Sequence, residues 1–256
     1  MTKPNVCVLR AAGTNCDGET VTACQRAGAK PERIHVNRLI ENPKLLADFQ
    51  ILIIPGGFTY GDDIAAGKVL AVQLANALAD AVGDFVNADK LVIGICNVFQ
   101  VLVKTGLLPD GHIGPQQVTL TANDSNRFED RWVSLRADSS RSVFIETGAQ
   151  LYLPIAHAEG KFVPRDEKTL KRLKDAGQIV FRYIAPDGGP ARYPYNPNGS
   201  VDDIAGICDA SGRILGLMPH PERHIEPWHH PQWTRNGLAP EGDGLAVFRN
   251  AVKYFQ

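Results

Sequence analysis

The sequence lacks an excess of charge of either sign, a long hydrophobic run and any paired cysteine motif. Its 256 residues carry 27 Lys and Arg against 28 Asp and Glu, a formal net charge of −1. A nucleic-acid-binding domain usually has a basic excess, so this balance argues against that class. No stretch of 18 or more apolar residues is present, so no membrane span is expected. The first residues also lack the apolar core of a signal peptide, from which we expect a cytosolic protein.

The five cysteines do not form a metal or redox motif. No two of them stand in a Cys-x-x-Cys arrangement. They are scattered through the chain at Cys7, Cys16, Cys24, Cys96 and Cys208. A zinc ribbon or a thioredoxin-type site is therefore not indicated, and no metal site is expected. A reducing cytosol would leave most of them as buried thiols. The useful question is whether one of them is a nucleophile.

Hydrophobic patterning predicts an α/β fold. In the first half, apolar runs typical of strands alternate with helical patterns. The predicted strands are residues 6–9, 33–36, 51–54 and 91–93, and the predicted helices are 17–27, 42–49, 62–86 and a segment that ends near Lys104. This alternation predicts a flavodoxin-like, doubly wound, mainly parallel sheet with helices on both faces.

The second half reads as β-hairpins added to that sheet. Turn-rich segments such as 186–189 and 196–199 separate short strand-like runs. These runs are residues 118–121, 132–136, 151–155, 179–184, 204–208 and 214–217. Residues 166–177 and 244–255 read as helices. No internal repeat, low-complexity tract or linker is visible, so we expect residues 1–256 to form a single domain.

The segment Gly-Ile-Cys-Asn at residues 94–97 has the layout of a nucleophile elbow. A buried strand ends in Gly-x-Cys and a helix begins at once. This turn would raise the side chain of Cys96 at the carboxyl end of the sheet, where open α/β sheets bind ligands. The N-terminus of the following helix favours a thiolate. Cys96 is therefore the candidate nucleophile, and a merely buried cysteine is the alternative.

Two further segments could complete a site for acyl transfer. In Met-Pro-His-Pro-Glu-Arg at 218–223, His220 could act as a base that Glu222 orients. Pro-Gly-Gly-Phe at 55–58 could bring backbone N–H groups close to a ligand, beside the N–H of Asn97. Read alone, the first could be a solvated surface pair and the second a chain-reversing turn.

Together these residues resemble the class I glutamine amidotransferases, whose pattern also includes Gln100, four residues after the cysteine. The chain resembles most closely one branch of this class, the glutaminase subunits of phosphoribosylformylglycinamidine synthase. The likeness runs from about Val6 to Tyr254. The segments that carry it are Gly-Thr-Asn-Cys-Asp at 13–17, Pro-Gly-Gly-Phe-Thr-Tyr-Gly-Asp-Asp at 55–63, Tyr-Asn-Pro-Asn-Gly-Ser at 195–200, Ile-Ala-Gly-Ile at 204–207, and 216–223.

The resemblance implies a Cys-His-Glu triad that hydrolyses glutamine to glutamate and ammonia. Cys96 would attack the side-chain amide and form a thioester, His220 would move the protons, and Glu222 would orient His220. The N–H groups of Gly57, or of its neighbour Phe58, and of Asn97 would hold the oxyanion.

The resemblance also implies a substrate-binding set. The segment His-Ala-Glu-Gly at 157–160 is similar to the family's His-Gly-Glu-Gly loop, which borders the α-amino and carboxylate groups of glutamine. Its alternative reading is a strand followed by a polar turn. The implied substrate-binding residues are Gln100, Glu159 and Gly160. We interpret Cys16 as structural or interfacial, because no base motif adjoins it.

The resemblance further implies partners. The ammonia would pass to a large synthase subunit that converts formylglycinamide ribonucleotide to formylglycinamidine ribonucleotide in purine biosynthesis, assisted by a small third subunit in the bacterial type. ATP and Mg²⁺ are expected on the synthase subunit and no cofactor on this chain. The chain has no Gly-x-x-x-x-Gly-Lys-Ser/Thr phosphate loop.

Three departures from the family pattern are present. Ala158 stands where the family's loop usually has glycine. Val98 stands where the family's elbow has a second glycine, and Ala12 stands where the family often has proline. The surroundings could compensate for Val98, or the elbow could be tilted and weakly active, or activity could require the docked synthase. A catalytically silent interaction subunit, in which Val98 spoils the oxyanion geometry, is therefore one alternative function. A cysteine hydrolase or peptidase on a related sheet is another, and Gln100 and the Pro-Gly-Gly loop weigh against it. The segment 224–243 is expected to be a docking segment or lid rather than a metal or nucleotide platform, although it carries Trp228, His229, His230 and Trp233.

Overall fold

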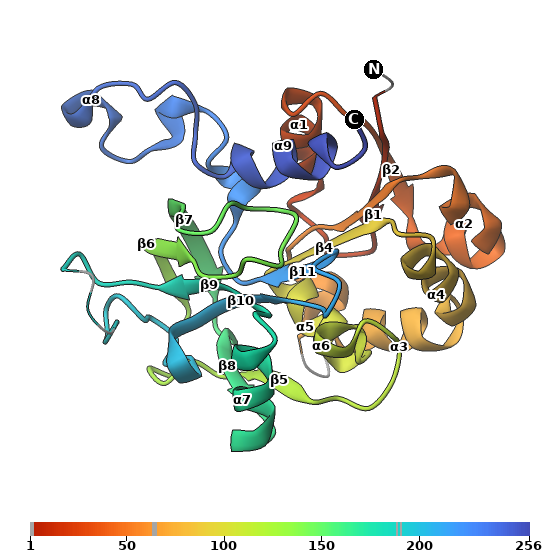
Figure 1. The fold of residues 1–256 in the computed structure, drawn as a ribbon. Coiled ribbons are helices and arrows are strands. Elements are labelled where there is room, and N and C mark those ends of the chain that lie inside the picture. The colour runs from red at the N-terminus through yellow and green to blue at the C-terminus, as the bar shows by residue number, and fades with distance from the viewer. Residues whose placement is uncertain (1–2, 63–65, 188, 190) are drawn as a thin grey trace.

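The computed structural model describes residues 3–62, 66–187, 189 and 191–256 (Figure 1). Its centre is a nine-stranded sheet with the order β2-β1-β3-β4-β11-β10-β9-β6-β7. Five neighbouring strands pair in parallel: β2 (Lys30–His35), β1 (Asn5–Arg10), β3 (Ile51–Ile54), β4 (Leu91–Ile95) and β11 (Ile214–Leu217). The remaining four continue the sheet in antiparallel pairs: β10 (Ile204–Cys208), β9 (Ile179–Tyr183), β6 (Glu129–Ala137) and β7 (Gln150–His157). The predicted parallel α/β sheet with added antiparallel strands is confirmed.

Helices cover both faces of this sheet, as Figure 1 shows. On one face lie α1 (Asp17–Arg26) and α9 (Leu245–Lys253), and on the other lies α5 (Asn97–Lys104). Apart from the two helices within residues 68–87, which are described below, the other helical elements are shorter or peripheral: α2 (Val36–Glu41), α6 (Leu107–Asp110), α7 (Glu167–Asp175), α8 (Trp233–Asn236), η1 (Pro43–Asp48), η2 (Thr59–Asp62), η3 (Val201–Asp203), η4 (Pro221–Arg223) and η5 (Pro227–His229). Of the predicted helices, 42–49 is a 3₁₀ helix, and α2 was not predicted.

The central strands are buried on both faces, which explains their uninterrupted apolar sequences. Every residue of β3 and β4 is buried, as expected for parallel strands covered by helices on both sides. Glycine inside β4 and β11 lets α5 approach closely. A side chain at Gly94 would lie 2.6 Å from Leu102, and one at Gly216 would lie 2.2 Å from Phe99. The two glycines thus seat α5, and with it the turn that precedes it, against the sheet.

The predicted helix over residues 62–86 is wrong as one element. It is two helices, α3 (Lys68–Asn76) and α4 (Ala79–Asn87), bent by 78°. A straight helix of that length would extend about 37 Å, well past strands of four or five residues. The bend keeps Leu74, Leu78 and Val82 buried. The start of this predicted helix and the predicted turn at 186–189 lie partly outside the described residues.

One predicted hairpin strand does not join the main sheet. β5 (Val118–Thr121) pairs in antiparallel fashion with β8 (Lys161–Pro164), a strand that the sequence did not predict, in a separate two-stranded sheet. Among the described residues, no single helix is long and apolar enough to cross a membrane. Only the bent pair of α3 and α4 passes that test when taken together.

Candidate active site

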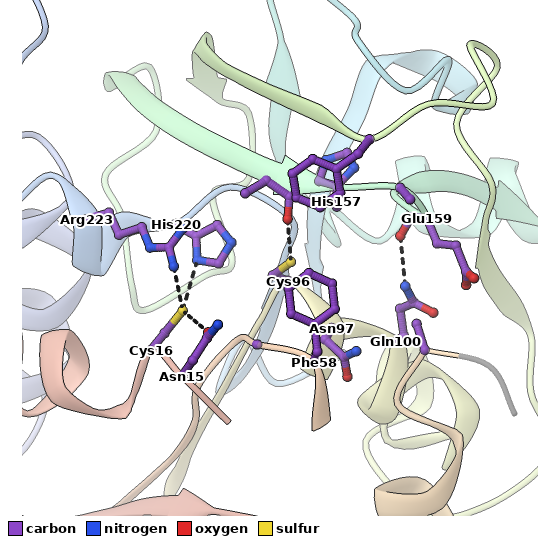
Figure 2. A pocket seen from close by; sticks show the side chains of 15 residues that line it. Asn15, Cys16, Phe58, Cys96, Asn97, Gln100, His157, Glu159, His220 and Arg223 are labelled. Atoms are coloured by element: carbon purple, nitrogen blue, oxygen red, sulfur yellow. Dashed lines mark hydrogen bonds between the residues drawn. The ribbon is translucent and has the colours of Figure 1, made fainter. Parts of the chain in front are cut away.

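A cavity of about 110 Å³ lies at the carboxyl ends of β1, β3, β4 and β11, where the segments that follow these strands meet (Figure 2). Seven of the nine predicted site residues line it: Gly57, Phe58, Cys96, Asn97, Gln100, Glu159 and His220. The other two, Glu222 and Gly160, are not among the lining residues. Side chains that the sequence analysis did not assign to the site also line it, among them Asn15, Cys16, His157 and Arg223.

Cys96 occupies the sharp turn that the sequence predicted. Its backbone angles are φ 54° and ψ −115°, a left-handed conformation that is uncommon for a residue with a side chain. The turn is held by the Cys96 N–H, which donates to the carbonyl of Leu217 at 2.8 Å, and by the N–H of Phe99, which donates to the carbonyl of Cys96 at 2.9 Å. Strain of this kind persists only where the surroundings impose it. The Cys96 thiol lies 3.7 Å from the carbonyl oxygen of Ala156.

The turn forms with Val98 in place. Val98 is the second residue of α5, is fully buried and belongs to the hydrophobic core. Its side chain therefore packs inside the fold, while the turn at Cys96 keeps its left-handed conformation.

His220 and Glu222 form a buried hydrogen-bonded pair. Nδ1 of His220 lies 2.6 Å from Oε1 of Glu222, and the two residues are 2% and 1% exposed. Burial by itself lowers the pKa of His220, but the charge of Glu222 and the interactions with Cys96 and Cys16 outweigh it and raise this pKa well above the ordinary value of 6.5. His220 is therefore held toward its protonated form.

Cys96 and His220 flank the same glycine. A side chain on Gly56 would come within 2.8 Å of Cε1 of His220 and within 3.2 Å of Cβ of Cys96. Glycine at this position therefore leaves room for the thiol and the imidazole to approach each other. Nε2 of His220 has no hydrogen-bond partner within the described part of the chain.

The loop after β3 requires glycine for a steric reason. Gly57 has φ 129°, and a Cβ there would lie 2.6 Å from the backbone nitrogen of Asn15. The neighbouring Phe58 is 50% exposed and stacks on Phe128 at the cavity, with ring centroids 6.3 Å apart.

Gln100 joins α5 to the loop that follows β7. Its Nε2 donates to the carbonyl of Glu159 at 2.8 Å, as Figure 2 shows. Gly160 lies behind this wall, because a side chain on it would meet the His157 ring at 2.3 Å. The predicted loop at 157–160 thus borders the cavity, with Gly160 as a supporting rather than a lining residue.

The structure places Cys16 at the cavity, which the sequence analysis did not predict, and its interpretation as structural or interfacial stays a prediction. Its Sγ lies 4.0 Å from Nδ1 of His220 and accepts a hydrogen bond from Nη2 of Arg223 at 3.1 Å (Figure 2). Burial raises the pKa of this thiol, although His220 and Arg223 act in the opposite direction. No base adjoins Cys16 in the sequence, but the fold brings one to it. Its position just after a strand of the parallel sheet was a signal that could have placed it here.

The cluster of Cys16, His220 and Glu222 has the residue types of a metal site, and its possible ligand atoms lie within 4.8 Å of one another. However, Nδ1 and Oε1 are only 2.6 Å apart. Two ligands of one tetrahedral zinc ion would be separated by about 3.3 Å. The geometry therefore favours a shared proton over a shared metal ion.

The segment after η4 carries the predicted Trp and His side chains. Trp228 is 56% exposed and Trp233 is 40% exposed, on a segment that projects from the body near α8 in Figure 1. His230 instead packs near Trp132 and His224, with ring centroids 6.1 and 5.9 Å apart. A docking or lid role for this segment stays a prediction.

Comparisons with known proteins identify the family of the chain. Residues 3–255 match the model of the CobB/CobQ-like glutamine amidotransferase domain. The chain is 47% identical to phosphoribosylformylglycinamidine synthase subunit PurQ of Dehalococcoides mccartyi, over 99% of this chain and 98% of that one. It is 45% identical to subunit PurQ of Methanococcus maripaludis strain C7, over 98% and 97% of the two chains.

A solved structure resembles the whole chain. A chain in the structure of PurLQS from Thermotoga maritima superposes with a TM-score of 0.75 and 31% identity, over 100% of both chains. The chain therefore belongs to the CobB/CobQ-like glutamine amidotransferase family, among the PurQ subunits of phosphoribosylformylglycinamidine synthase.

Proposed function

We propose that this chain hydrolyses glutamine to glutamate and ammonia, and that it supplies the ammonia to a synthase subunit of purine biosynthesis. The observation that carries the proposal is the left-handed turn at Cys96, which faces His220 across Gly56. Behind it, Glu222 holds Nδ1 of His220 at 2.6 Å. A thiol, an imidazole and a carboxylate in this order are the parts of an activated nucleophile.

The reaction follows from these three groups. The Cys96 thiolate attacks the side-chain carbonyl carbon of glutamine, and protonated His220 gives its proton to the departing nitrogen, so that ammonia leaves and a thioester remains. His220 then takes a proton from water, which attacks the thioester and releases glutamate. Because Glu222 accepts from Nδ1, the imidazole keeps Nε2 available for both proton transfers.

The surroundings support the oxyanion and substrate assignments. Asn97 is the first residue of α5, so its backbone N–H lies at the positive end of that helix. Gly57 and Phe58 border the same cavity and are proposed as the source of the second donor. Gln100 and Glu159 form the opposite wall, and Gly160 supports it from behind.

The proposed partners come from the relatives. Those named above are subunits of phosphoribosylformylglycinamidine synthase, and the solved relative lies in a PurLQS assembly. We infer a cytoplasmic complex in which a large synthase subunit uses ATP and Mg²⁺ to convert formylglycinamide ribonucleotide to formylglycinamidine ribonucleotide. A small third subunit completes the proposed complex.

The decisive experiment compares two thiols that both lie near His220. Cys96→Ala should lower glutaminase kcat by a factor of about 10³ or more, because no nucleophile remains, while Cys16→Ala should keep most of the activity. Turnover is measured as glutamate release, with and without the synthase partner. An α-amino diazoketone analogue of glutamine should label Cys96 and leave Cys16 unmodified. The assignment fails if Cys16→Ala is inactive and Cys96→Ala is active.

A further inference from the structure

Two buried asparagines hold the loop at residues 157–160, which forms one wall of the cavity. Asn123 and Asn198 are 1% and 0% exposed, and neither lines the cavity. Asn198 belongs to the Asn-Pro-Asn-Gly-Ser segment at 196–200, which the proposed chemistry does not use. The two segments also contact each other, because the N–H of Asp124 donates to the carbonyl of Asn198 at 3.2 Å.

Asn123 uses the whole hydrogen-bonding capacity of its side-chain amide. Its Nδ2 donates to the carbonyls of His157 and Arg127, at 2.8 and 2.9 Å. Its Oδ1 accepts from the N–H of Gly160 at 3.0 Å and lies 3.2 Å from Nδ1 of His157. His157 and Gly160 are the first and last residues of the loop, so the side chain of Asn123 fixes both ends of the loop.

This arrangement also selects one tautomer of His157. Since Nδ2 of Asn123 already donates twice, Oδ1 must be the acceptor and Nδ1 of His157 must carry the proton. Nε2 is then an acceptor, and it has no partner within the described part of the chain. Burial and the charge of His220 lower the pKa of His157 to about 3, so the ring stays neutral.

Asn198 holds the loop from the other side. Its Nδ2 donates to the carbonyl of Gly160 at 2.8 Å and to the hydroxyl of Tyr183, in β9, at 3.0 Å. Its own Oδ1 accepts from the N–H of Ser200 at 3.1 Å. Ser200 also accepts the N–H of Phe162, just beyond the loop, at 3.0 Å. The loop is therefore tied to the main sheet through Asn198.

The wall held in this way carries contacts to the proposed substrate site. The carbonyl of Ala156, just before the loop, lies 3.7 Å from the Cys96 thiol, and the carbonyl of Glu159 accepts from Gln100 (Figure 2). A shift of the loop would move the carbonyl of Glu159 and the side chains of the loop relative to Cys96. A misplacement of about 1 Å can cost a large factor in binding or rate.

We propose that Asn198, with Asn123, is a positioning residue for glutamine: it holds the 157–160 wall at the distance from Cys96 that the substrate requires. The inference rests on the proposed glutaminase function. It assigns to the Asn-Pro-Asn-Gly-Ser segment a part in substrate affinity rather than in the chemical step.

The test is Asn198→Asp, which keeps the shape of the side chain and removes both N–H donors. The matched control is Gln178→Glu, because Gln178 is 2% exposed and its Nε2 donates to two carbonyls, of Pro109 and Cys208, away from the cavity. Asn198→Asp should raise the KM for glutamine about fivefold or more, the factor that corresponds to one net hydrogen bond, with a much smaller change in kcat. Gln178→Glu should leave KM unchanged.

Two further measurements separate positioning from a general loss of fold. Tyr183→Phe removes only one partner of Asn198 and should raise KM in the same direction but less. Alkylation of Cys96 by iodoacetamide should proceed at the parental rate in Asn198→Asp, whereas labelling by the diazoketone analogue should slow. Equal effects of Asn198→Asp and Gln178→Glu on KM, or an unchanged KM in both Asn198→Asp and Tyr183→Phe, would overturn the inference. A parental chain that turns over no glutamine would refute the proposed function instead.

Discussion

Replacement of Val98 by glycine restores the family's elbow pattern, and it tests whether the valine weakens the site. Val98 is the second residue of α5 and is fully buried in the core. The left-handed turn at Cys96 is present with the valine in place. We therefore expect Val98→Gly to cost stability and to give no gain in glutaminase activity.

The magnitude follows from burial. The substitution removes three buried carbons, worth about 0.8 kcal/mol each, and adds a further penalty of roughly 0.5 kcal/mol for glycine in a helix. The free energy of unfolding should fall by about 3 kcal/mol. For a chain of this size, that corresponds to a decrease in Tm of roughly 6–12 °C.

The assay combines thermal unfolding with glutamate release, with and without the synthase partner. The expected result is a lower Tm with kcat/KM within about threefold of the parental value. An increase of kcat/KM by tenfold or more, with an unchanged Tm, would refute this reasoning. It would mean that Val98 tilts the elbow and that the native chain is a weakened glutaminase.

Three other predictions concern the loop after β3, an acid-sensitive histidine and an exposed surface. Gly57→Ala should lower kcat by about 10² or more, because the loop that supplies a proposed oxyanion donor must move; Gly28→Ala, also at positive φ but with no atom within 4 Å, should leave kcat unchanged. The pKa of His157, lowered to about 3, means that the unfolded chain binds this proton more readily. The free energy of unfolding should therefore be highest above about pH 6.5 and should fall as the pH decreases toward 3. In urea titrations at several pH values, His157→Leu should reduce this dependence on pH. The same pH dependence in the variant and the parental chain would contradict the assignment. Alanine at both Trp228 and Trp233 should change the free energy of unfolding by less than about 0.5 kcal/mol but weaken capture of the synthase subunit, and unchanged capture would exclude docking through these side chains.

Several parts of the fold could be predicted because they depend on local sequence. The uninterrupted apolar run of β3 matches its observed bounds, since a strand buried on both faces needs apolar residues throughout. The turn at Cys96 was predictable because a strand, a glycine and a helix start meet within four residues. The bend between α3 and α4 could not be predicted from the sequence, because the helical spacing of apolar residues continues through both helices. Only the short sheet beneath them limits their length.

The sequence by itself determined the alternation of strands and helices, the elbow cysteine and the His-x-Glu pair, because each is encoded within a few neighbouring residues. Only the tertiary structure decided what surrounds them. Cys16 and His220 are 204 positions apart and meet because β1 and β11 lie in one parallel sheet, whose carboxyl ends share an edge. The wall held by Asn123 and Asn198 likewise joins three distant segments. Which segments meet depends on the order of strands in the sheet, and short-range sequence patterns do not encode that order.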